Sequence, residues 1–364
     1  MDRNHERSDA ETELSAPTTI TRGTTMSTNS IETRSLSLEE WNDVLPDSGT
    51  EVFHTAPALE AVDNHTEGEL QLYGGFKGDQ PVALLPVFID HKAVGRVVTS
   101  PPPSMGIPRL GPLLLSNSPK QRKKETVNYG FTAEILDDLS VDARLTLFRM
   151  ICPRAYADPR PFQWNQLKVT PEFTYILDLA DVTDDTVMDP FSRSLRNEMR
   201  RGEEIDVTVG IEGRGAAKRI WDSVGSHFEE QGMQPPIAWE FVRDLLEALP
   251  EHHRVYVARE PDGSFSSGII VLYSDDTAYF WLGGIMTTYD GVSVNSLLHK
   301  RVIEDIVTEP QLESVTRYDL VGANTERLCE YKGKFSGDLV PYYVVESVGP
   351  EMKLAKGAYN FASR

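Results

Sequence analysis

A helix rich in arginine stands out in a chain of 364 residues that is otherwise acidic. Residues 191–201 have helical character and carry four arginines, of which Arg193, Arg196 and Arg200 follow at spacings of three and four. Such spacings place the three on one face of a helix. A guanidinium binds a carboxylate or phosphate through two parallel hydrogen bonds. The segment predicts a clamp for an anionic substrate group; the alternative is a solvated helix that pairs with the surrounding acids.

A strand, a tight turn and a helix form a second place where an anion can be held. Residues 277–286 have the apolar and aromatic content of a buried strand. Residues 293–307 carry apolar side chains at helical spacing, and the turn between the two elements contains Gly291. A helix N-terminus beside the end of a buried strand binds anions through its backbone N–H groups. We therefore expect the functional site within residues 277–346.

The elements that must position these residues follow a similar order in both halves of the chain. The first half is expected to contain helices at 37–45 and 55–62, a hairpin at 70–76 and 81–89, a strand at 94–99, a helix at 131–156 and a strand at 166–179. The second half is expected to contain helices at 216–230 and 237–249 and a hairpin at 254–259 and 267–273. The recurring order predicts two similar domains. Within the first half, the proline-rich segment 100–112 is expected to be an irregular loop.

The expected domain limits follow from composition and from this repeat. Residues 1–30 are rich in Ser, Thr and charge, which predicts a disordered extension, and Met26 is a candidate true start. Residues 31–180 and 181–348 are predicted to form the two domains, and residues 349–364 a tail.

The acidic balance limits the partners. The net charge is −20, with 12 Lys against 24 Arg, a composition expected of a protein that stays soluble in concentrated salt. The alternative is an ordinary acidic cytosolic protein. In either case free nucleic acid is not an expected partner, because phosphate binding needs clustered positive charge.

Two cysteines, Cys152 and Cys329, lie far apart and predict reduced thiols and a cytoplasmic location. The longest apolar run, residues 82–89, is far shorter than a membrane span, and the N-terminus lacks the apolar core of a signal peptide. No metal site is expected, since neither paired cysteines nor a His-Glu-x-x-His motif occurs. A serine-hydrolase elbow and a P-loop are also missing from the sequence.

Three motifs in the second half carry a resemblance to a known superfamily. Residues 318–322 read Tyr-Asp-Leu-Val-Gly, Asn324 is followed at seven residues by Tyr331, and residues 331–337 read Tyr-Lys-Gly-Lys-Phe-Ser-Gly. Together with the basic helix at 195–202, they resemble the N-acyltransferase core of the GNAT superfamily and its Fem-type members. The resemblance implies an α/β fold of two tandem GNAT-like domains, each a mixed twisted sheet flanked by helices.

The resemblance also implies a reaction. An acyl group passes from an activated donor, acyl-CoA such as acetyl-CoA, to an amine of a small molecule or peptide. The acceptor is expected in a cleft between the domains, held by the arginine helix and Lys332. The donor-binding residues expected by analogy are Gly283, Gly284, Ile285, Gly291, Ser293 and Asn295. This turn departs from the superfamily pattern, because Thr288 brings no charge and Asp290 brings a negative one.

Roles for the catalytic residues follow from what acyl transfer requires. It needs a neutral amine, an oxyanion contact and a proton for the leaving group. Backbone N–H groups of residues 283–285 are expected to supply the oxyanion contact, and Tyr331 the proton. Lys332 is expected to bind an anionic group or stabilise developing charge, and Asp319 to orient or deprotonate the amine. The alternatives are a core tyrosine, a solvated lysine, and a helix cap or ion-pair partner at Asp319.

Two rival functions remain open. A Fem-type enzyme can take its donor from aminoacyl-tRNA, and this predicts binding that weakens steeply with salt. A catalytically inactive GNAT-like binding protein would show no turnover in any variant.

Overall fold

A computed structural model describes residues 31–93, 95–115, 118–141, 146–230, 232–233, 235 and 237–349 of the chain. The expected extension at residues 1–30 and residues 350–364 of the expected tail lie outside this part. Within it, Cys152 and Cys329 are free thiols, as expected. No helix in these ranges is long and apolar enough to cross a membrane.

The strands form one thirteen-stranded sheet whose order is β1-β2-β3-β4-β6-β15-β7-β14-β11-β10-β9-β8, with β5 beside β3. The strands of the first half are β1 (Glu32–Leu36), β2 (Glu69–Lys77), β3 (Gln80–His91), β4 (Arg96–Ser100), β5 (Leu113–Leu114), β6 (Thr146–Ile151) and β7 (Lys168–Asp178). Those of the second half are β8 (Thr208–Glu212), β9 (His253–Arg259), β10 (Phe265–Tyr273), β11 (Thr277–Gly283), β14 (Arg317–Asp319) and β15 (Asp338–Glu346). A separate two-stranded sheet contains β12 (Thr288–Tyr289) and β13 (Val292–Ser293).

The sheet repeats the same plan from its two ends. Each half has one parallel pair, β4 with β6 and β11 with β14. At the centre the halves exchange strands, because β15 pairs with β6 while β7 pairs with β14. The expected fold of two similar α/β domains is confirmed. The division of the chain at residue 180 stays a prediction, since the sheet runs through both halves.

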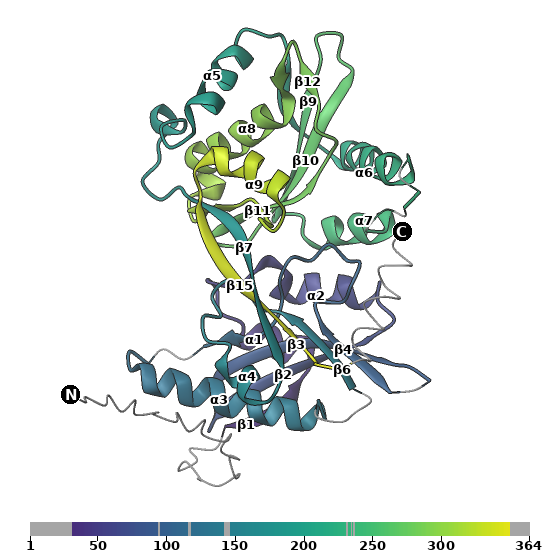
Figure 1. Ribbon diagram of the computed structural model, residues 1–364, viewed down its shortest axis with the longest axis vertical. Helices are drawn as coiled ribbons and strands as arrows, with labels where there is room; N and C mark the ends of the chain where they lie inside the picture. The colour runs from purple at the N-terminus through teal and green to yellow at the C-terminus, as the bar shows by residue number, and fades with distance from the viewer. Residues whose placement is uncertain are drawn as a thin grey trace, which may run out of the picture.

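Helices cover both faces of the sheet (Figure 1). They are α1 (Leu38–Val44), α2 (Ala56–Asp63), α3 (Gln121–Asp138), α4 (Arg160–Trp164), α5 (Arg193–Gly202), α6 (Arg214–Glu230), α7 (Trp239–Ala248), α8 (Val294–Thr308) and α9 (Glu326–Lys332). Single 3-10 turns occur at η1 (Val52–His54), η2 (Asp184–Thr186), η3 (Pro310–Leu312) and η4 (Gly333–Phe335). The expected capping box of the first helix is confirmed at Ser37 and Glu40.

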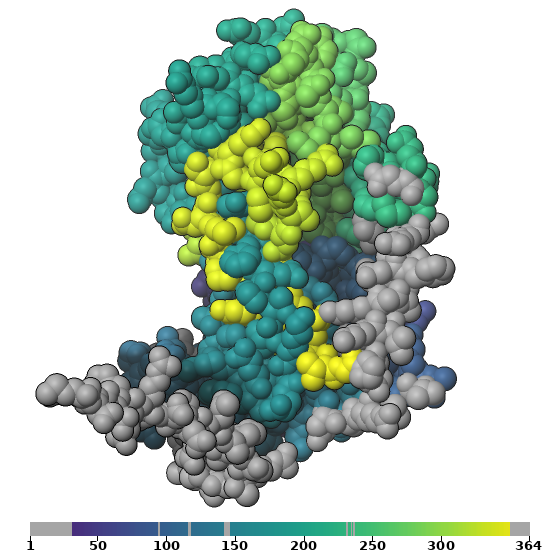
Figure 2. Space-filling model, viewed as in Figure 1, coloured from purple at the N-terminus to yellow at the C-terminus, as the bar shows by residue number. Residues whose placement is uncertain are grey.

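One apolar core joins the two halves. It contains Trp41 and Leu59 near α1 and α2 together with Ile220 and Phe241 from α6 and α7. Two further cores lie under α3 and α4 and under α5 and α8. In the space-filling view the halves meet across a narrower waist, where residues of β7 and β15 reach the surface (Figure 2). The halves are therefore held together by a shared core and by exchanged strands.

The prediction of a helix over residues 131–156 is wrong for the second part of this range. The helix α3 ends at Asp138, and Thr146–Ile151 form strand β6. Along β6 burial alternates residue by residue, the pattern of a strand with one face covered. Thr146, Phe148 and Met150 are buried, whereas the residues between them face the opposite side of the sheet. The buried residues at alternate positions, of which Phe148 and Met150 are apolar, carried the strand signal.

Candidate active site

The parallel strands β11 and β14 separate after three residue pairs. They are paired from Thr277 with Arg317 to Tyr279 with Asp319. Beyond that point the chain after β14 turns to β7, because Leu320 N donates to Tyr175 O at 2.9 Å. On the other side, β11 carries a bulge at Trp281, where its register against β10 shifts. An opening in the sheet results, with the start of α8 beside it.

Four side chains gather at this opening, and we call Phe280, His299, Tyr331 and Lys332 the notch. His299 contacts the Phe280 ring edge-on, with ring centroids 4.7 Å apart. Its ring also lies near that of Tyr331, at 6.0 Å. Burial, with a contribution from the charge of Lys332, lowers the pKa of His299 to about 3. The imidazole is therefore neutral and shares a hydrogen bond of 2.8 Å with the hydroxyl of Tyr318.

Lys332 is buried at the end of α9, and its ammonium closes onto the loop after β14. Its Nζ donates to the carbonyls of Val321 and Gly322 at 2.6 and 3.0 Å. The same atom lies 5.5 Å from the centre of the Phe280 ring. Burial lowers the pKa of Lys332 to about 8, although Asp319 opposes the change. This lysine is not the solvated charge of the alternative interpretation, and near neutral pH part of it is uncharged.

Tyr331 points its hydroxyl toward the first turn of α8. Burial raises the pKa of Tyr331, an effect that the neighbouring Ser296 partly offsets. In the described part of the chain neither Tyr331 OH nor Ser296 Oγ completes a hydrogen bond. Two buried hydroxyls without partners are costly unless something else binds them. The pair is thus oriented toward the helix start with unused hydrogen-bonding capacity.

The turn before α8 is tied down by α5. Ser293 caps α8 as expected, accepting from Ser296 N, and its own N–H donates to Glu198 Oε1 at 2.8 Å. Asn295 Oδ1 accepts from Thr287 N at 3.1 Å. Gly291 has φ of +71°, the conformation for which glycine is favoured. The turn therefore has the expected glycine and helix cap, but the N–H groups of Thr287 and Ser293 already bind acceptors of the protein.

Of the oxyanion contacts expected at residues 283–285, the one from Gly284 is wrong, and those from Gly283 and Ile285 stay predictions. Gly284 N donates to Gly268 O at 2.8 Å, so this N–H continues the ladder with β10. Gly283 lies opposite Ile269 in register, and its N–H points to the other edge of the strand, because hydrogen-bonding directions alternate along an antiparallel pair. Ile285 is exposed, and its carbonyl accepts from Ser267 Oγ at 2.8 Å. The bulge lies earlier than the expected splay, at Trp281, and this keeps Gly284 within the sheet.

Asp319 lies at the end of β14 but is fully buried in an ion pair, as in the alternative interpretation of this residue. Its carboxylate bonds to Arg109 of the proline-rich loop and accepts from Thr174 Oγ1 at 2.5 Å. Arg109 also binds Glu51 at 3.1 Å. Burial disfavours the charge of Arg109, but Asp319 and Glu51 outweigh it and raise its pKa. Asp319 thus links the two halves through Arg109, and its side chain is shielded from solvent.

The arginine helix α5 packs against α8 and β13 (Figure 1). Arg193 is exposed, Arg196 donates to the carbonyls of Asp189 and Phe191, and Arg200 donates to Asn197. The fourth arginine, Arg201, reaches the carbonyls of Asp290 and Gly291 at 3.2 and 3.1 Å. The helix therefore supports the turn, and it lies away from the cavity described next.

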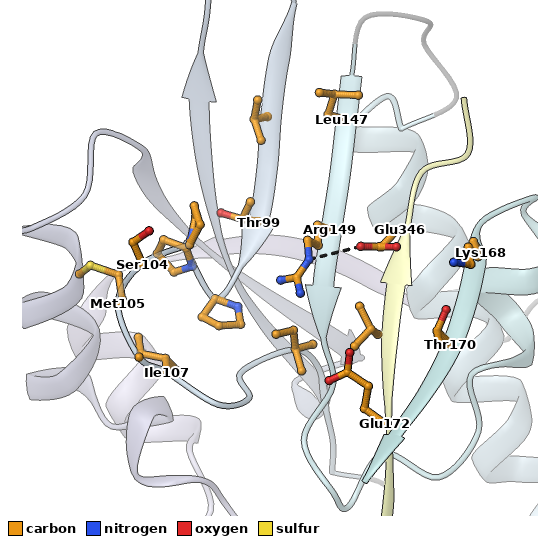
Figure 3. A pocket seen from close by; sticks show the side chains of 17 residues that line it. Thr99, Ser104, Met105, Ile107, Leu147, Arg149, Lys168, Thr170, Glu172 and Glu346 are labelled. Carbon is orange, nitrogen blue, oxygen red and sulfur yellow. Dashed lines mark ion pairs between the residues drawn. The ribbon is translucent and has the colours of Figure 1, made fainter. Parts of the chain in front are cut away.

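A cavity of about 570 Å³ lies beneath the loop of residues 101–107. Its floor is one face of β4, β6, β15 and β7 (Figure 3). One row across these strands contains Thr99, Arg149, Glu346 and Lys168, which are paired in register. Glu346 is buried and lies 3.3 Å from Arg149 Nε. This cavity was not predicted, because its strand β6 was assigned to a helix and the pairing of β15 between β6 and β7 was not expected.

Polar contacts connect the cavity to the notch. Glu172 in the cavity accepts from Tyr342 OH at 2.9 Å, and Tyr342 OH accepts from Asn324 Nδ2 at 3.1 Å. Asn324 follows Gly322, whose carbonyl holds Lys332. On the other side Trp281, the bulge residue, donates from Nε1 to Gly106 O of the covering loop at 3.0 Å. The segments next to the notch, at Trp281 and at Asn324, thus reach the residues that line the cavity.

Comparison with known proteins agrees with this architecture. Residues 191–333 match a family model described as an acetyltransferase (GNAT) domain. No curated protein sequence matches the chain.

Similar solved structures extend the likeness to the whole fold. FemX is 10% identical, with a TM-score of 0.65 over 92% of this chain and 100% of FemX. A C-terminal domain described as belonging to a lysylphosphatidylglycerol synthetase from Agrobacterium fabrum is 13% identical, with a TM-score of 0.54 over 87% of this chain and 94% of its own. A tandem GNAT protein from the clavulanic acid biosynthesis pathway is 10% identical, with a TM-score of 0.51 over 88% and 99%. Residues 191–333 thus match a GNAT domain, and the chain as a whole shares its fold with FemX and with a tandem GNAT protein.

Proposed function

We propose that the protein transfers an acyl group from acyl-CoA to an amine, with the thioester carbonyl placed in the notch. The observation that carries this proposal is the separation of β11 from β14 beside the start of α8. The opening brings buried hydroxyls and a buried lysine to one place. A carbonyl oxygen is the kind of group that can complete the hydrogen bonds of Tyr331 and Ser296.

The reaction balances with one proton moved at each end. The amine nitrogen attacks the thioester carbon, the C–S bond breaks, the nitrogen loses a proton and the thiolate gains one. Tyr331 is the proposed donor to the thiolate, because its raised pKa keeps the phenol protonated near neutral pH. Lys332 is proposed to stabilise the negative charge that develops on the carbonyl oxygen. Asp319 is proposed to act indirectly, by fixing Arg109 and the loop after β14.

The donor's phosphates are proposed to lie along the turn at Gly291, Ser293 and Asn295, with α5 beside them. Arg193 and Arg200 of α5 are exposed on this side of the molecule, and Arg201 already touches the turn. A diphosphate in this position would interact with the α8 N-terminus. It would displace the Glu198 carboxylate from Ser293 N, because both groups need the same N–H.

Calorimetric titration of acetyl-CoA and longer acyl-CoAs in molar KCl tests the donor. Binding, followed by thiol release in the presence of amines, supports the proposal. Failure of every acyl-CoA to bind removes this donor. A matched measurement on Glu198→Gln is expected to give tighter binding than wild type, since the competing negative charge is gone.

A second donor, aminoacyl-tRNA, is favoured by one observation. Glu198 at Ser293 and the exposed Asp290 both put negative charge where a pyrophosphate would lie. Aminoacyl transfer from charged tRNA that falls steeply with salt would select this donor instead. An inactive binding protein is the conclusion if neither donor supports turnover and Tyr331→Phe or Lys332→Ala changes nothing.

A further inference from the structure

We propose that the cavity beneath residues 101–107 binds the acceptor, and that the acceptor carries a carboxylate at one end and its reactive amine at the other. A free amino acid derivative or a short peptide of about dipeptide length has this chemistry. The assignment rests on the proposed acyl transfer, because it names the acceptor class for the same reaction.

The charged row at one end of the cavity supplies the carboxylate site. Arg149 and Lys168 lie on either side of Glu346, on neighbouring strands (Figure 3). Two cations for one carboxylate leave the row with one positive charge in excess. Arg149 is a planar donor suited to a second carboxylate, and its side chain is 38% exposed. In a chain with a net charge of −20, the end of the pocket that presents this surplus cation favours anions.

The other end of the cavity supplies the ammonium site. Glu172 lies on the same face of β7 as Lys168 and Thr170, four residues along the strand from Lys168. At about 3.3 Å per residue, the two Cα atoms are roughly 13 Å apart. Glu172 Oε2 is fixed by Tyr342 OH, which orients the carboxylate without neutralising it. A ligand ammonium at this end faces a negative charge, and its carboxylate faces a positive one.

The size and lining of the cavity fit a short peptide. Apolar side chains fill the middle of the floor and the roof, among them Ile151, Val344, Met105 and Ile107. An extended dipeptide is roughly 7 Å long. This length fits between the charged ends of Lys168 and Glu172, because both side chains extend into the cavity from strand positions that lie farther apart. A volume of about 570 Å³ is in the range of small-ligand sites. A polyamine would leave the row at Arg149 without an anion, and an amino sugar would do the same.

The position of Glu172 directs the amine toward the notch. Thr174 follows on the same face of β7, and its hydroxyl bonds to Asp319 and accepts from Gly322 N at 3.2 Å. Gly322 O in turn holds Lys332. The amine end of the acceptor therefore lies toward the strand end at which β14 leaves β11. The carboxylate end lies on the far side of the cavity.

Three matched peptides test the proposal by calorimetry on the full chain without donor. Gly-Leu carries both charges, Gly-Leu amide lacks the carboxylate, and N-acetyl-Gly-Leu lacks the amine. We expect Gly-Leu to bind at least about tenfold more tightly than either analogue, since each loses a charge-assisted contact. Equal binding of all three, or no binding by any, overturns the proposal.

Variants assign each end. Lys168→Met and Arg149→Met are expected to lower the affinity for Gly-Leu toward that of the amide and to leave the amide unchanged. Glu172→Gln is expected to abolish the preference over N-acetyl-Gly-Leu. Lys123→Met, at an exposed lysine of α3 outside the cavity, is the control and is expected to behave as wild type. Because Arg149 pairs with the buried Glu346, Lys168→Met provides the test should Arg149→Met fail to fold.

The outcomes separate this inference from the donor assignment. Selective peptide binding without acyl-CoA binding keeps the cavity and removes the donor. Acyl-CoA binding with thiol release that is equally fast for amines with and without a carboxylate keeps the acyltransferase and removes the acceptor class.

Discussion

The parallel strand pair of the first half stays together for longer than its counterpart in the second half. The strands β4 and β6 are paired over five residues, from Arg96 with Thr146 to Ser100 with Met150. In the second half β11 and β14 pair over three residues, and β11 carries the bulge at Trp281. The same plan therefore gives a closed sheet in one half and an open one in the other.

The helices that follow β11 and β4, α8 and α3, also differ in how they begin. The helix α8 begins after a short turn, and Ser293 caps it. The helix α3 begins at Gln121 after a long proline-rich loop. Its N-cap residue, Lys120, makes no side-chain cap, and Arg122, Lys123 and Lys124 lie in its first turns. The loop that separates β4 from α3 in the first half instead covers the charged cavity. One copy of the repeat has the opening that we propose for the donor, and the other has the covered floor that we propose for the acceptor.

Stability is expected to depend most strongly on Arg109, whose ion pairs with Glu51 and Asp319 join the two halves. In Arg109→Met, Glu51 and Asp319 lose their shared buried cation, which is expected to cost about 3–5 kcal/mol of unfolding free energy. Urea denaturation measures the change.

The matched control for Arg109 is Arg317→Met on β14, which breaks a partly exposed pair with Asp276. A change of less than about 1 kcal/mol is expected there. Similar costs at the two sites would show that the buried network is not what couples the halves.

Loss of the notch lysine is expected to reduce turnover more than stability. Lys332→Met removes the proposed charge beside the carbonyl oxygen and is expected to lower kcat/KM about 100-fold. Lys334→Met, two residues on and exposed, serves as the control and should retain wild-type kinetics. If both variants have the same kcat/KM, the reaction does not take place at the notch.

Much of the architecture could be predicted from local patterns, whereas the network between the halves could not. The capping box at Ser37 and the hairpin strands have short-range signals that the structure confirms. The strand Thr146–Ile151 was assigned to a helix because the preceding helical pattern was extended across it. Arg109 lies in a loop without periodicity, and its partners are 58 and 210 residues away. Long-range pairing of this kind leaves no trace in sequence spacing.

In the candidate site, too, local motifs could be predicted and long-range neighbours could not. The segment with Tyr331 and Lys332 was predicted, and the structure places both at the strand opening with His299. His299 was missed, although it lies on the apolar face of α8 near Val302 and Ile303. The cavity residues Arg149, Lys168 and Glu346 come from three strands, so their proximity depends on the exchange of β7 and β15.

The buried lysine also makes stability depend on pH. The folded-state pKa of Lys332 is about 8, below its ordinary value of 10.5. Between these values the unfolded chain binds more protons at this site, so stability rises with pH from about 8 to about 10.5. Relative to Lys332→Met, wild type is expected to gain about 2 kcal/mol between pH 7 and 10. Parallel urea curves for the two proteins at both pH values measure it, and a constant difference would contradict it.

The smallest expected effects concern the two helix starts. Ser293→Ala removes the cap of α8 and is expected to cost about 0.5–1 kcal/mol. Lys120→Ser adds a cap to α3 at an N-cap position that already has extended backbone angles, and it removes a cation from the positive end of the helix dipole. A gain of about 0.5–1 kcal/mol is expected in urea denaturation. If Lys120→Ser instead destabilises the protein, the cations at the start of α3 make contacts that offset the dipole, and the two helix starts are more alike than their caps suggest.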